Sequence, residues 1–235
     1  MNLTLRRVLA QTRFETLTVL RNGEQLLLAV ILPLIALVGL PQIGLAGVQT
    51  AAAGVLGLAV ASTAFTGQGI QTAFDRRYGV LRQLATTPLG ASGVIGGKLG
   101  AVLCVLAVQT VLVLVCAAVL GLDPAPVSWT GVALALFAGS GALVSWGVLM
   151  AGTLRPEATL AVANLLWVLM AAAGGLLLPR EGLWGQLVGW LPPGALGEAL
   201  RAAVTAGTIA WVPLLVLAAW ALAGALAARR WFSFD

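Results

Sequence analysis

Residues 99–122, LGAVLCVLAVQTVLVLVCAAVLGL, run for 24 positions without a charged side chain. A helix needs about 20 mostly apolar residues to cross the hydrocarbon core of a bilayer. Two more uncharged runs, residues 124–154 and 202–228, are each long enough for one crossing. The pattern predicts an integral membrane protein built from helices.

The composition of the whole chain supports this prediction. Of its 235 residues, 60% are hydrophobic and 9% are charged, and the mean hydropathy is +1.01. Soluble domains carry about 25% charged residues, and disordered chains are poor in apolar ones. Both of these classes are therefore excluded.

Taken together, the uncharged runs predict an all-α fold with six transmembrane helices. Residues 25–74 form a run of 50 that holds two helices, because the stretch from Pro41 to Gly47 supplies a break between them. Residues 158–179 form a further run of 22. The predicted spans are residues 26–41, 48–71, 99–121, 128–152, 158–178 and 209–228.

Residues 1–24 precede the predicted transmembrane domain of residues 25–235. They place Leu5, Leu9 and Leu17 at roughly helical spacing, with arginines between them. This pattern predicts an amphipathic helix that lies on the inner leaflet. A frayed basic tail is the alternative.

Two uncharged runs, residues 83–97 and 182–197, are too short to span and are rich in Gly and Pro. Non-helical backbone is tolerated at membrane depth only where protein or a wet cavity covers it. We therefore place the first run at the inner surface, within a loop of residues 75–98. The second run belongs to a re-entrant outer segment, residues 180–207.

Basic residues in short loops predict the orientation, because they accumulate on the cytoplasmic side. With the N-terminus inside, only Arg180 and Arg201 lie outside. Both termini are therefore expected in the cytoplasm. The eleven inner basic residues are Arg6, Arg7, Arg13, Arg21, Arg76, Arg77, Arg82, Lys98, Arg155, Arg229 and Arg230.

The chain lacks the residues of common catalytic sites. It has no His, and its two cysteines, Cys104 and Cys116, lie in one apolar run. Gly97-Lys98 does not complete a P-loop, because residue 92 is Ser and residue 99 is Leu. We expect no enzyme activity, no metal site, no cofactor bound by this chain and no nucleic-acid partner.

Every Asp, Glu, Arg and Lys maps to a span end or a loop, which argues against a proton relay or a transporter driven through a buried acid. Neutral polar side chains do occur inside the spans. Gln68, Gln71 and Asn164 are candidates to line a translocation path. Such groups also form hydrogen bonds between helices, and this is the interpretation we favour for any single residue.

The loop of residues 75–98 reads DRRYGVLRQLATTPLGASGVIGGK. Tyr78, Leu81 and Leu84 fall at helical spacing, and Pro88 ends the helix that they predict at about residues 78–86. A short helix with an exposed apolar stripe is a docking site for a soluble partner. The alternative, a helix that floats on the headgroups, fits the pattern equally well.

This loop resembles the cytosolic loop of ABC-2 type transporter permeases, which reads approximately D-R-E-x-G-T-L-E-x-L-x-x-T-P before a Gly-Lys pair. Arg77 and Arg82 depart from it, standing where the family usually has acids. A second similarity lies at residues 174–201, in Gly174-Gly175, Pro179, Trp190-Leu191-Pro192-Pro193 and Glu198-Ala199-Leu200-Arg201. The matching loop residues are Asp75, Arg76, Gly79, Leu81, Leu84, Thr87, Pro88, Gly97 and Lys98.

The resemblance covers essentially the whole chain, and its size and arrangement are similar to permeases of the daunorubicin/doxorubicin-exporter type. It implies two permease subunits, as a homodimer or heterodimer, and two copies of a separate ABC ATPase that binds ATP and magnesium. Spans one, two and five would face the second permease and the path. The implied setting is the plasma membrane of a bacterium, with a hydrophobic or amphipathic cargo such as a drug or lipid.

The resemblance also implies roles for particular residues. The loop helix would transmit ATP-driven movement to the spans, and an outer segment would shape the outer gate. The implied ATPase-coupling residues are Asp75, Arg76, Tyr78, Gly79, Leu81, Leu84 and Pro88. The implied outer-gate residues are Pro179, Trp190, Pro192 and Pro193.

Two other classes of membrane protein are alternatives to this interpretation. A vitamin-capturing membrane subunit of an energy-coupling factor importer also has about six spans in this size range. An integral membrane enzyme is disfavoured, because the chain lacks His and intramembrane acids.

Overall fold

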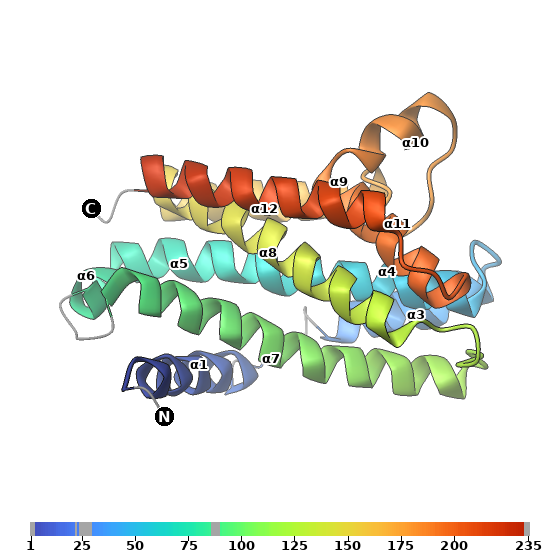
Figure 1. The fold of residues 1–235 in the computed structure, drawn as a ribbon, viewed down its shortest axis with the longest axis horizontal. Helices are drawn as coiled ribbons and strands as arrows, with labels where there is room; N and C mark the ends of the chain where they lie inside the picture. The colour runs from blue at the N-terminus through green and yellow to red at the C-terminus, as the bar shows by residue number, and fades with distance from the viewer. Residues whose placement is uncertain (1–2, 22, 24–29, 86–89, 233–235) are drawn as a thin grey trace.

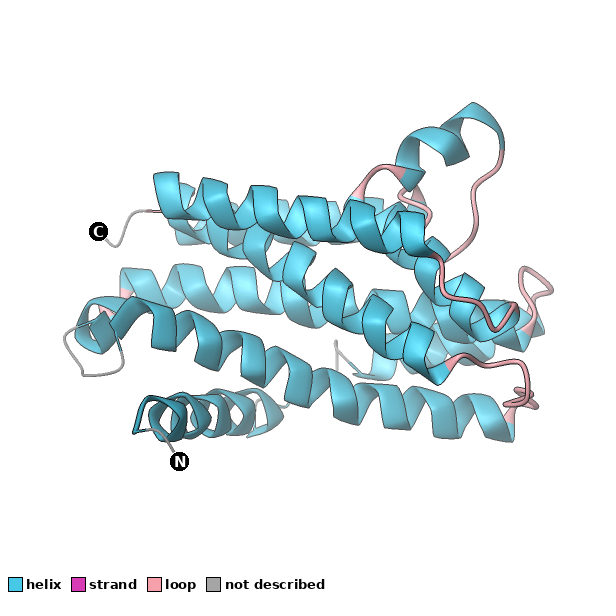
Figure 2. Ribbon diagram, viewed as in Figure 1, coloured by secondary structure: helices cyan, strands magenta, loops and turns pink. Residues whose placement is uncertain are grey.

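The computed structural model describes residues 3–21, 23, 30–85 and 90–232. Every regular element among them is a helix, and Figure 2 shows no strand in this part of the chain. The all-α prediction is therefore confirmed there. The elements are α1 (Leu3–Arg21), α3 (Leu32–Gln42), α4 (Val48–Val60), η2 (Ala61–Gly67), α5 (Gln68–Arg77), α6 (Val80–Ala85), α7 (Gly90–Val119), α8 (Trp129–Thr153), α9 (Pro156–Ala172), α10 (Gly182–Gly189), α11 (Pro192–Thr205) and α12 (Trp211–Trp231).

The long helices run side by side along the long axis of the molecule (Figure 1). The short helix α6 lies at one end, which we call the α6 end, together with the last turns of α12 (Trp211–Trp231), and α10 and α11 lie toward the other, the α10 end. Large apolar side chains on α7, α9 and α12 are exposed, including Val115, Leu165 and Leu215. An outer surface of this kind suits lipid, because it would be unfavourable in water.

The centre of the bundle is one continuous helix, Val48–Arg77, formed by α4, the π-helical segment η2 and α5. Every residue from Ala51 to Ala61 is buried inside the chain. Small side chains make this possible, since alanines and glycines let neighbouring helices approach closely. At Gly54, an added Cβ would meet the backbone of Leu177.

Four helices among the described residues are long and apolar enough to cross a membrane: Val48–Arg77, Gly96–Val119, Trp129–Thr153 and Trp211–Trp231. They lie at four of the six predicted spans. The other two predictions, residues 26–41 and 158–178, correspond to shorter apolar helices, Leu32–Gln42 and Pro156–Ala172. Residues 26–29 lie outside the described residues. Among the described residues, four helices are therefore long enough to span a membrane, and shorter apolar helices lie at the other two predicted positions.

The helix α9 ends six residues earlier than its predicted span. Its last turn closes when the N–H groups of Ala173 and Gly174 both donate to the carbonyl of Leu169. Gly175 then adopts a left-handed conformation, with φ of 72°, which glycine reaches without strain. The Gly174-Gly175 pair is thus a helix stop.

The Gly-rich stretch before the third predicted span is helical. Residues 90–97, which we expected in a surface loop, form the first two turns of α7, and α7 starts nine residues before the predicted position 99. The glycines serve packing, because α1 crosses α7 at this point. A Cβ on Gly97 would collide with the side chain of Gln11, and one on Gly100 would lie 2.5 Å from Thr12 Oγ1.

The N-terminal helix turns several polar side chains toward the protein. Gln11, Thr12 and Glu15 face α7 or its neighbours, whereas Leu9 and Phe14 are exposed, as are the arginines Arg6, Arg7 and Arg13. The exposed surface of this helix therefore mixes large apolar side chains with arginines. It fits a helix whose apolar side meets lipid.

Residues 180–207 contain two short helices, α10 and α11, separated by a turn at Trp190 and Leu191. The helix α11 is largely buried and packs against α4, α8 and α12. The loop before α10, and α10 itself, project from the bundle (Figure 1).

Candidate functional site

The turn between α5 and α6 is built on Gly79. The N–H of Gly79 donates to the carbonyl of Arg76 at 3.1 Å, and its φ of 73° is a left-handed conformation that favours glycine. The following helix, Val80–Ala85, lies within the helix predicted at about residues 78–86. The two residues Tyr78 and Gly79 thus form the turn at the α6 end, and the short helix α6 follows directly.

The side chains around this turn divide into outward-facing and inward-facing sets. Tyr78 is 70% exposed and stacks against Phe74, with ring centroids 6.1 Å apart. Val80 is also exposed. Leu81 is only 5% exposed, so the expectation that it joins an exposed apolar stripe is corrected. The side chain of Leu84 and the whole of Pro88 lie outside the described residues.

Arg76 and Arg77 join the end of α5 to the turn between α8 and α9. Arg76 Nη2 donates to the carbonyl oxygen of Leu154 at 2.7 Å, which satisfies a carbonyl just past the end of α8. Arg77 forms an ion pair with Glu157 in the first turn of α9. Arg76, predicted as an ATPase-coupling residue, therefore holds two helix ends together.

A buried cluster of charges lies beside this turn and connects three helices. Lys98 of α7, 3% exposed, places its Nζ 2.7 Å from Asp75 Oδ2 of α5 and 3.2 Å from Glu15 Oε1 of α1. Gln71 Nε2 donates to Glu15 Oε2 at 2.8 Å, and Gln11 Nε2 donates to Glu15 Oε1 at 3.0 Å. We call these five residues the Lys98 cluster.

The Lys98 cluster constrains how α1, α5 and α7 move relative to one another. A buried charge without a partner is expensive, so the ammonium group and the two carboxylates stay together unless all of them reach water. Asp75 lies only a few residues before α6 on the same backbone. The cluster therefore links the end of α5, which leads into α6, to both α7 and α1.

The sequence indicated only part of this cluster. The motif of the loop includes both Asp75 and Lys98, but it does not indicate that their side chains form a pair. Glu15 lies within the amphipathic helix predicted for residues 1–24, and that pattern does not indicate its burial. One further part of the cluster could be predicted from the sequence. Gln71 and Asp75 lie four residues apart, so they share one face of a helix.

A second polar region lies deeper, around η2. Trp167 Nε1 donates to Ser62 Oγ at 2.8 Å, and Thr63 Oγ1 donates to Gln109 Oε1 at 3.0 Å. These hydrogen bonds link the central helix to α9 and α7. They fit the interhelical interpretation of the polar side chains. A π-helical segment often occurs at a functional position in a helix.

The three candidate path residues occupy different surroundings. Gln68 is 2% exposed and lies inside the chain, and Gln71 belongs to the Lys98 cluster. The side-chain carbonyl oxygens of both residues are buried and have no hydrogen-bond partner among the described residues. Asn164 is exposed on α9, between apolar side chains that are also exposed. The structure does not bring these three side chains together.

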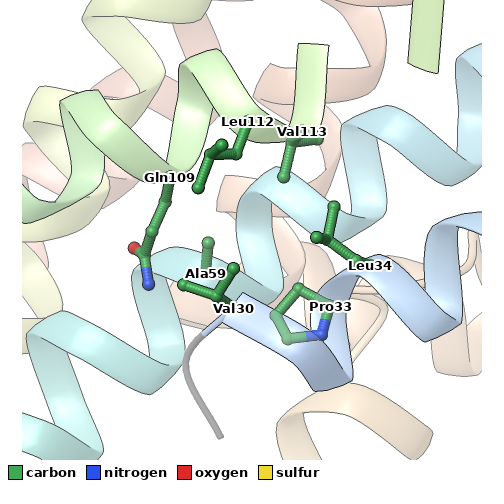
Figure 3. Close-up of a pocket in the computed structure, with 7 residues that line it drawn as sticks. All are labelled: Val30, Pro33, Leu34, Ala59, Gln109, Leu112 and Val113. Atoms are coloured by element: carbon green, nitrogen blue, oxygen red, sulfur yellow. The ribbon is translucent and has the colours of Figure 1, made fainter. Parts of the chain in front are cut away.

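An apolar crevice lies between α3, α4 and α7 (Figure 3). The amide of Gln109 stands at its edge, with Leu112 and Val113 on the same helix and Pro33 and Leu34 opposite. It has no room for a water molecule. The crevice is a gap between packed apolar side chains.

The predicted outer-gate residues lie near one another but are not equivalent. Pro179 and Trp190 are exposed, Pro192 is half-buried and Pro193 is buried. The carbonyl of Trp190 accepts a hydrogen bond from Trp220 Nε1 at 2.8 Å, which attaches the α10–α11 turn to α12.

Arg201 of α11 holds the chain that leads into the α10–α11 segment. Its guanidinium donates to the carbonyls of Gly175 and Leu176 at 3.0 and 3.3 Å. Burial lowers the pKa of Arg201 below its ordinary value, and the charge of Glu198 opposes this effect. Arg201, read from the sequence as an outer loop charge, is thus a structural residue.

Comparison with protein families matches residues 2–219 to the family described as ABC-2 type transporter. Comparison with curated proteins and with solved structures found no match. The matched region includes the α5–α6 turn, the Lys98 cluster and the α10–α11 segment. The chain belongs to the ABC-2 type transporter family, whose members are membrane permease subunits of ABC transporters.

Proposed function

We propose that the chain is the permease subunit of an ABC exporter, and that two permease subunits form a translocation path driven by two separate ATPase subunits. ABC-2 permeases generally work with an ABC ATPase partner. The proposal rests on one observation: side-chain contacts connect the region of α6 to α1, α5 and α7. The short helix stands at the end of the bundle and is coupled through Asp75 to the Lys98 cluster.

The proposed topology has six spans, with α3 and α9 as the first and fifth. Both helices are apolar but short, so residues next to them would complete the crossing. The distribution of basic residues supports a cytoplasmic location for the α6 end and both termini. The helices α10 and α11 form the outer re-entrant segment in this arrangement.

The proposed mechanism is a rigid-body switch between inward-open and outward-open states. The ATPase contacts the exposed side chains of α6, above all Tyr78 and Val80. Leu81 does not touch the partner but fixes α6 to its own chain. Arg76 and the Lys98 cluster pass the movement to α8, α7 and α1.

We further propose that the second permease subunit packs against α9. An exposed Asn164 among exposed leucines and valines is costly in lipid, and a second chain would supply hydrogen-bond partners. The outer half of the second span cannot serve this purpose, because Ala51–Ala61 is covered within the chain. Away from the α6 end, the four long helices carry no charged side chain, which suits a hydrophobic or amphipathic cargo, such as a drug or lipid.

Co-purification with the ABC ATPase tests the coupling role of α6. Tyr78→Asp combined with Val80→Asp should abolish ATPase association, because it places charges in an apolar contact. The matched control is Leu183→Asp combined with Leu187→Asp. These leucines are exposed on α10, toward the opposite end of the bundle, and their substitution should leave association unchanged.

Equal ATPase recovery with the α6 variant and with the unmodified chain would refute this role. The family match favours a permease over the vitamin-capturing subunit of an energy-coupling factor importer. Tight binding of a small vitamin by the isolated chain would reverse that preference.

A further inference from the structure

Three side chains with oxygen atoms share one face of α5, beside the Lys98 cluster. Asp75 lies four residues after Gln71 and three after Thr72, so its side chain neighbours both of theirs on the helix surface. Gln71 and Asp75 are also members of the Lys98 cluster. We call the set of Gln71, Thr72 and Asp75 the α5 oxygen site.

Each of these three side chains has an oxygen atom that can accept a further interaction. The amide oxygen of Gln71 and the hydroxyl oxygen of Thr72 are buried, and neither has a hydrogen-bond partner among the described residues. Thr72 as a whole is only 2% exposed. The ion pair of Asp75 with Lys98 uses Oδ2, which leaves Oδ1 as an acceptor. Buried polar atoms in folded proteins nearly always have partners, so these neighbouring acceptors indicate a place for a ligand.

The charge of the Lys98 cluster indicates which ligand is suited to this place. Glu15 and Asp75 supply two negative charges and Lys98 supplies one positive charge, so the balance is one negative charge. The side chains of Lys98 and Glu15 are each only 4% exposed. The neighbouring Arg76 is directed to α8, where it donates to the carbonyl of Leu154. A buried charge without compensation is costly, so one additional positive charge is favoured.

The chemistry of the ligands favours an alkali cation. Amide, hydroxyl and carboxylate oxygens are the ligands of hard cations. Three or more Asp, Glu, His or Cys side chains together would favour a divalent ion, and the part of the chain that the structure describes contains no such group. The side chain of Asp75 is 21% exposed, so an ion from water can reach the site at this edge.

We propose that the α5 oxygen site binds one monovalent alkali cation, sodium or potassium, through oxygens of Gln71, Thr72 and Asp75. The cation neutralises the Lys98 cluster and satisfies the two buried acceptors. It thereby becomes part of the contact between α1, α5 and α7. The inference goes beyond the proposed function and concerns the chain alone, so it does not depend on the ATPase or on the cargo.

Thermal unfolding of the purified full chain in detergent tests this site. Sodium chloride and potassium chloride are each compared with N-methyl-D-glucamine chloride, whose organic cation is too large to bind between neighbouring side chains. An alkali cation in about tenfold excess over its dissociation constant should raise the Tm by about 3–6 °C relative to the organic salt at equal concentration.

Thr72→Val removes the hydroxyl oxygen and keeps the shape of the side chain. It should abolish the rise in Tm. In the organic salt this variant should be at least as stable as the unmodified chain, because a buried hydroxyl without a partner has been removed. Thr72→Ser keeps the oxygen and should retain most of the rise.

The matched control is Thr66→Val. The Oγ1 atom of Thr66 is also buried without a hydrogen-bond partner among the described residues, but Thr66 lies in η2, six positions before Thr72 and outside the site. This control should keep the full rise in Tm.

Three results would overturn the proposal. The first is an equal Tm of the unmodified chain in all three salts. The second is an equal rise in Thr72→Val and Thr66→Val, which would place the cation elsewhere on the chain. The third is stabilisation by lower pH without any by sodium or potassium, which would indicate that the cluster takes up a proton instead. All of these measurements are made without the ATPase, so their failure is separate from failure of the permease proposal.

Discussion

Lys98 is the residue on which the α6 end depends most. Its ammonium group lies between Asp75 and Glu15, and the Glu15 carboxylate also accepts hydrogen bonds from Gln71 of α5 and Gln11 of α1. Such a group gives little net stability compared with apolar packing, but removing one member leaves unpaired charge. The cluster is therefore better suited to fixing an arrangement of helices than to stabilising the fold.

Replacing Lys98 by Met should lower the free energy of unfolding by about 3–5 kcal/mol, because two buried carboxylates lose their cation. Unfolding of the purified chain in detergent measures this loss. The variant Glu15→Gln, Asp75→Asn, Lys98→Met removes all three charges and should recover most of the stability. A triple variant less stable than Lys98→Met alone would show that the charges are not coupled.

At the residue scale, the sequence indicates a candidate stretch but not the direction of its side chains. Asp75, Arg76 and Tyr78 all belong to the predicted coupling loop, yet only Tyr78 points outward. Sequence spacing defines which residues share a face of one helix. It does not define which helix covers that face, and Glu15 and Lys98 are 83 positions apart in the chain.

The pairing of α1 with α7 determines the structure at the scale of elements. The glycines before Lys98 led to the prediction of a surface loop, because Gly and Pro are common in loops. In a membrane protein the same composition also marks close helix contacts. Here the contact explains Gly97 and Gly100, since Gln11 and Thr12 lie directly over them.

Neighbouring glycines of α7 allow a matched test of this contact. Gly97→Ala places a Cβ within 2.9 Å of Gln11 Cβ and should displace α1 at a cost of about 1–3 kcal/mol. Gly96→Ala meets only Val8 Cγ1, at 3.6 Å, and should be neutral or stabilising by up to about 1 kcal/mol.

Hydrogen exchange of residues 3–21 is the readout for this pair. Faster exchange in Gly97→Ala than in Gly96→Ala is the expected result. Identical exchange in the two variants would mean that α1 does not depend on the contact.

At the scale of the whole molecule, the chain belongs to a family whose members generally work with an ABC ATPase partner. Its membrane character and its family follow from long uncharged runs and from the loop motif, and both were accessible from the sequence. The length of α9 was not, because hydropathy does not show where a helix stops. The Gly174-Gly175 stop lies inside an uncharged run and is invisible to a count of charges.

The proposed contact between two permease subunits predicts a specific cross-link. In a background with Cys104 and Cys116 replaced by Ser, Asn164→Cys should form a disulfide between two copies in the membrane. Leu222→Cys, exposed on α12, should not. Cross-linking at residue 222 in place of 164 would assign the subunit contact to α12.

The most direct test of the account concerns the side and accessibility of Tyr78. In the same Ser background, Tyr78→Cys is labelled with a membrane-impermeant maleimide in inside-out and right-side-out vesicles. Leu183→Cys, exposed on α10, reports the opposite side. The account predicts that residue 78 is labelled only in inside-out vesicles and is protected when the ABC ATPase is added. Labelling of residue 78 from the external side, or labelling that the ATPase does not change, would contradict it.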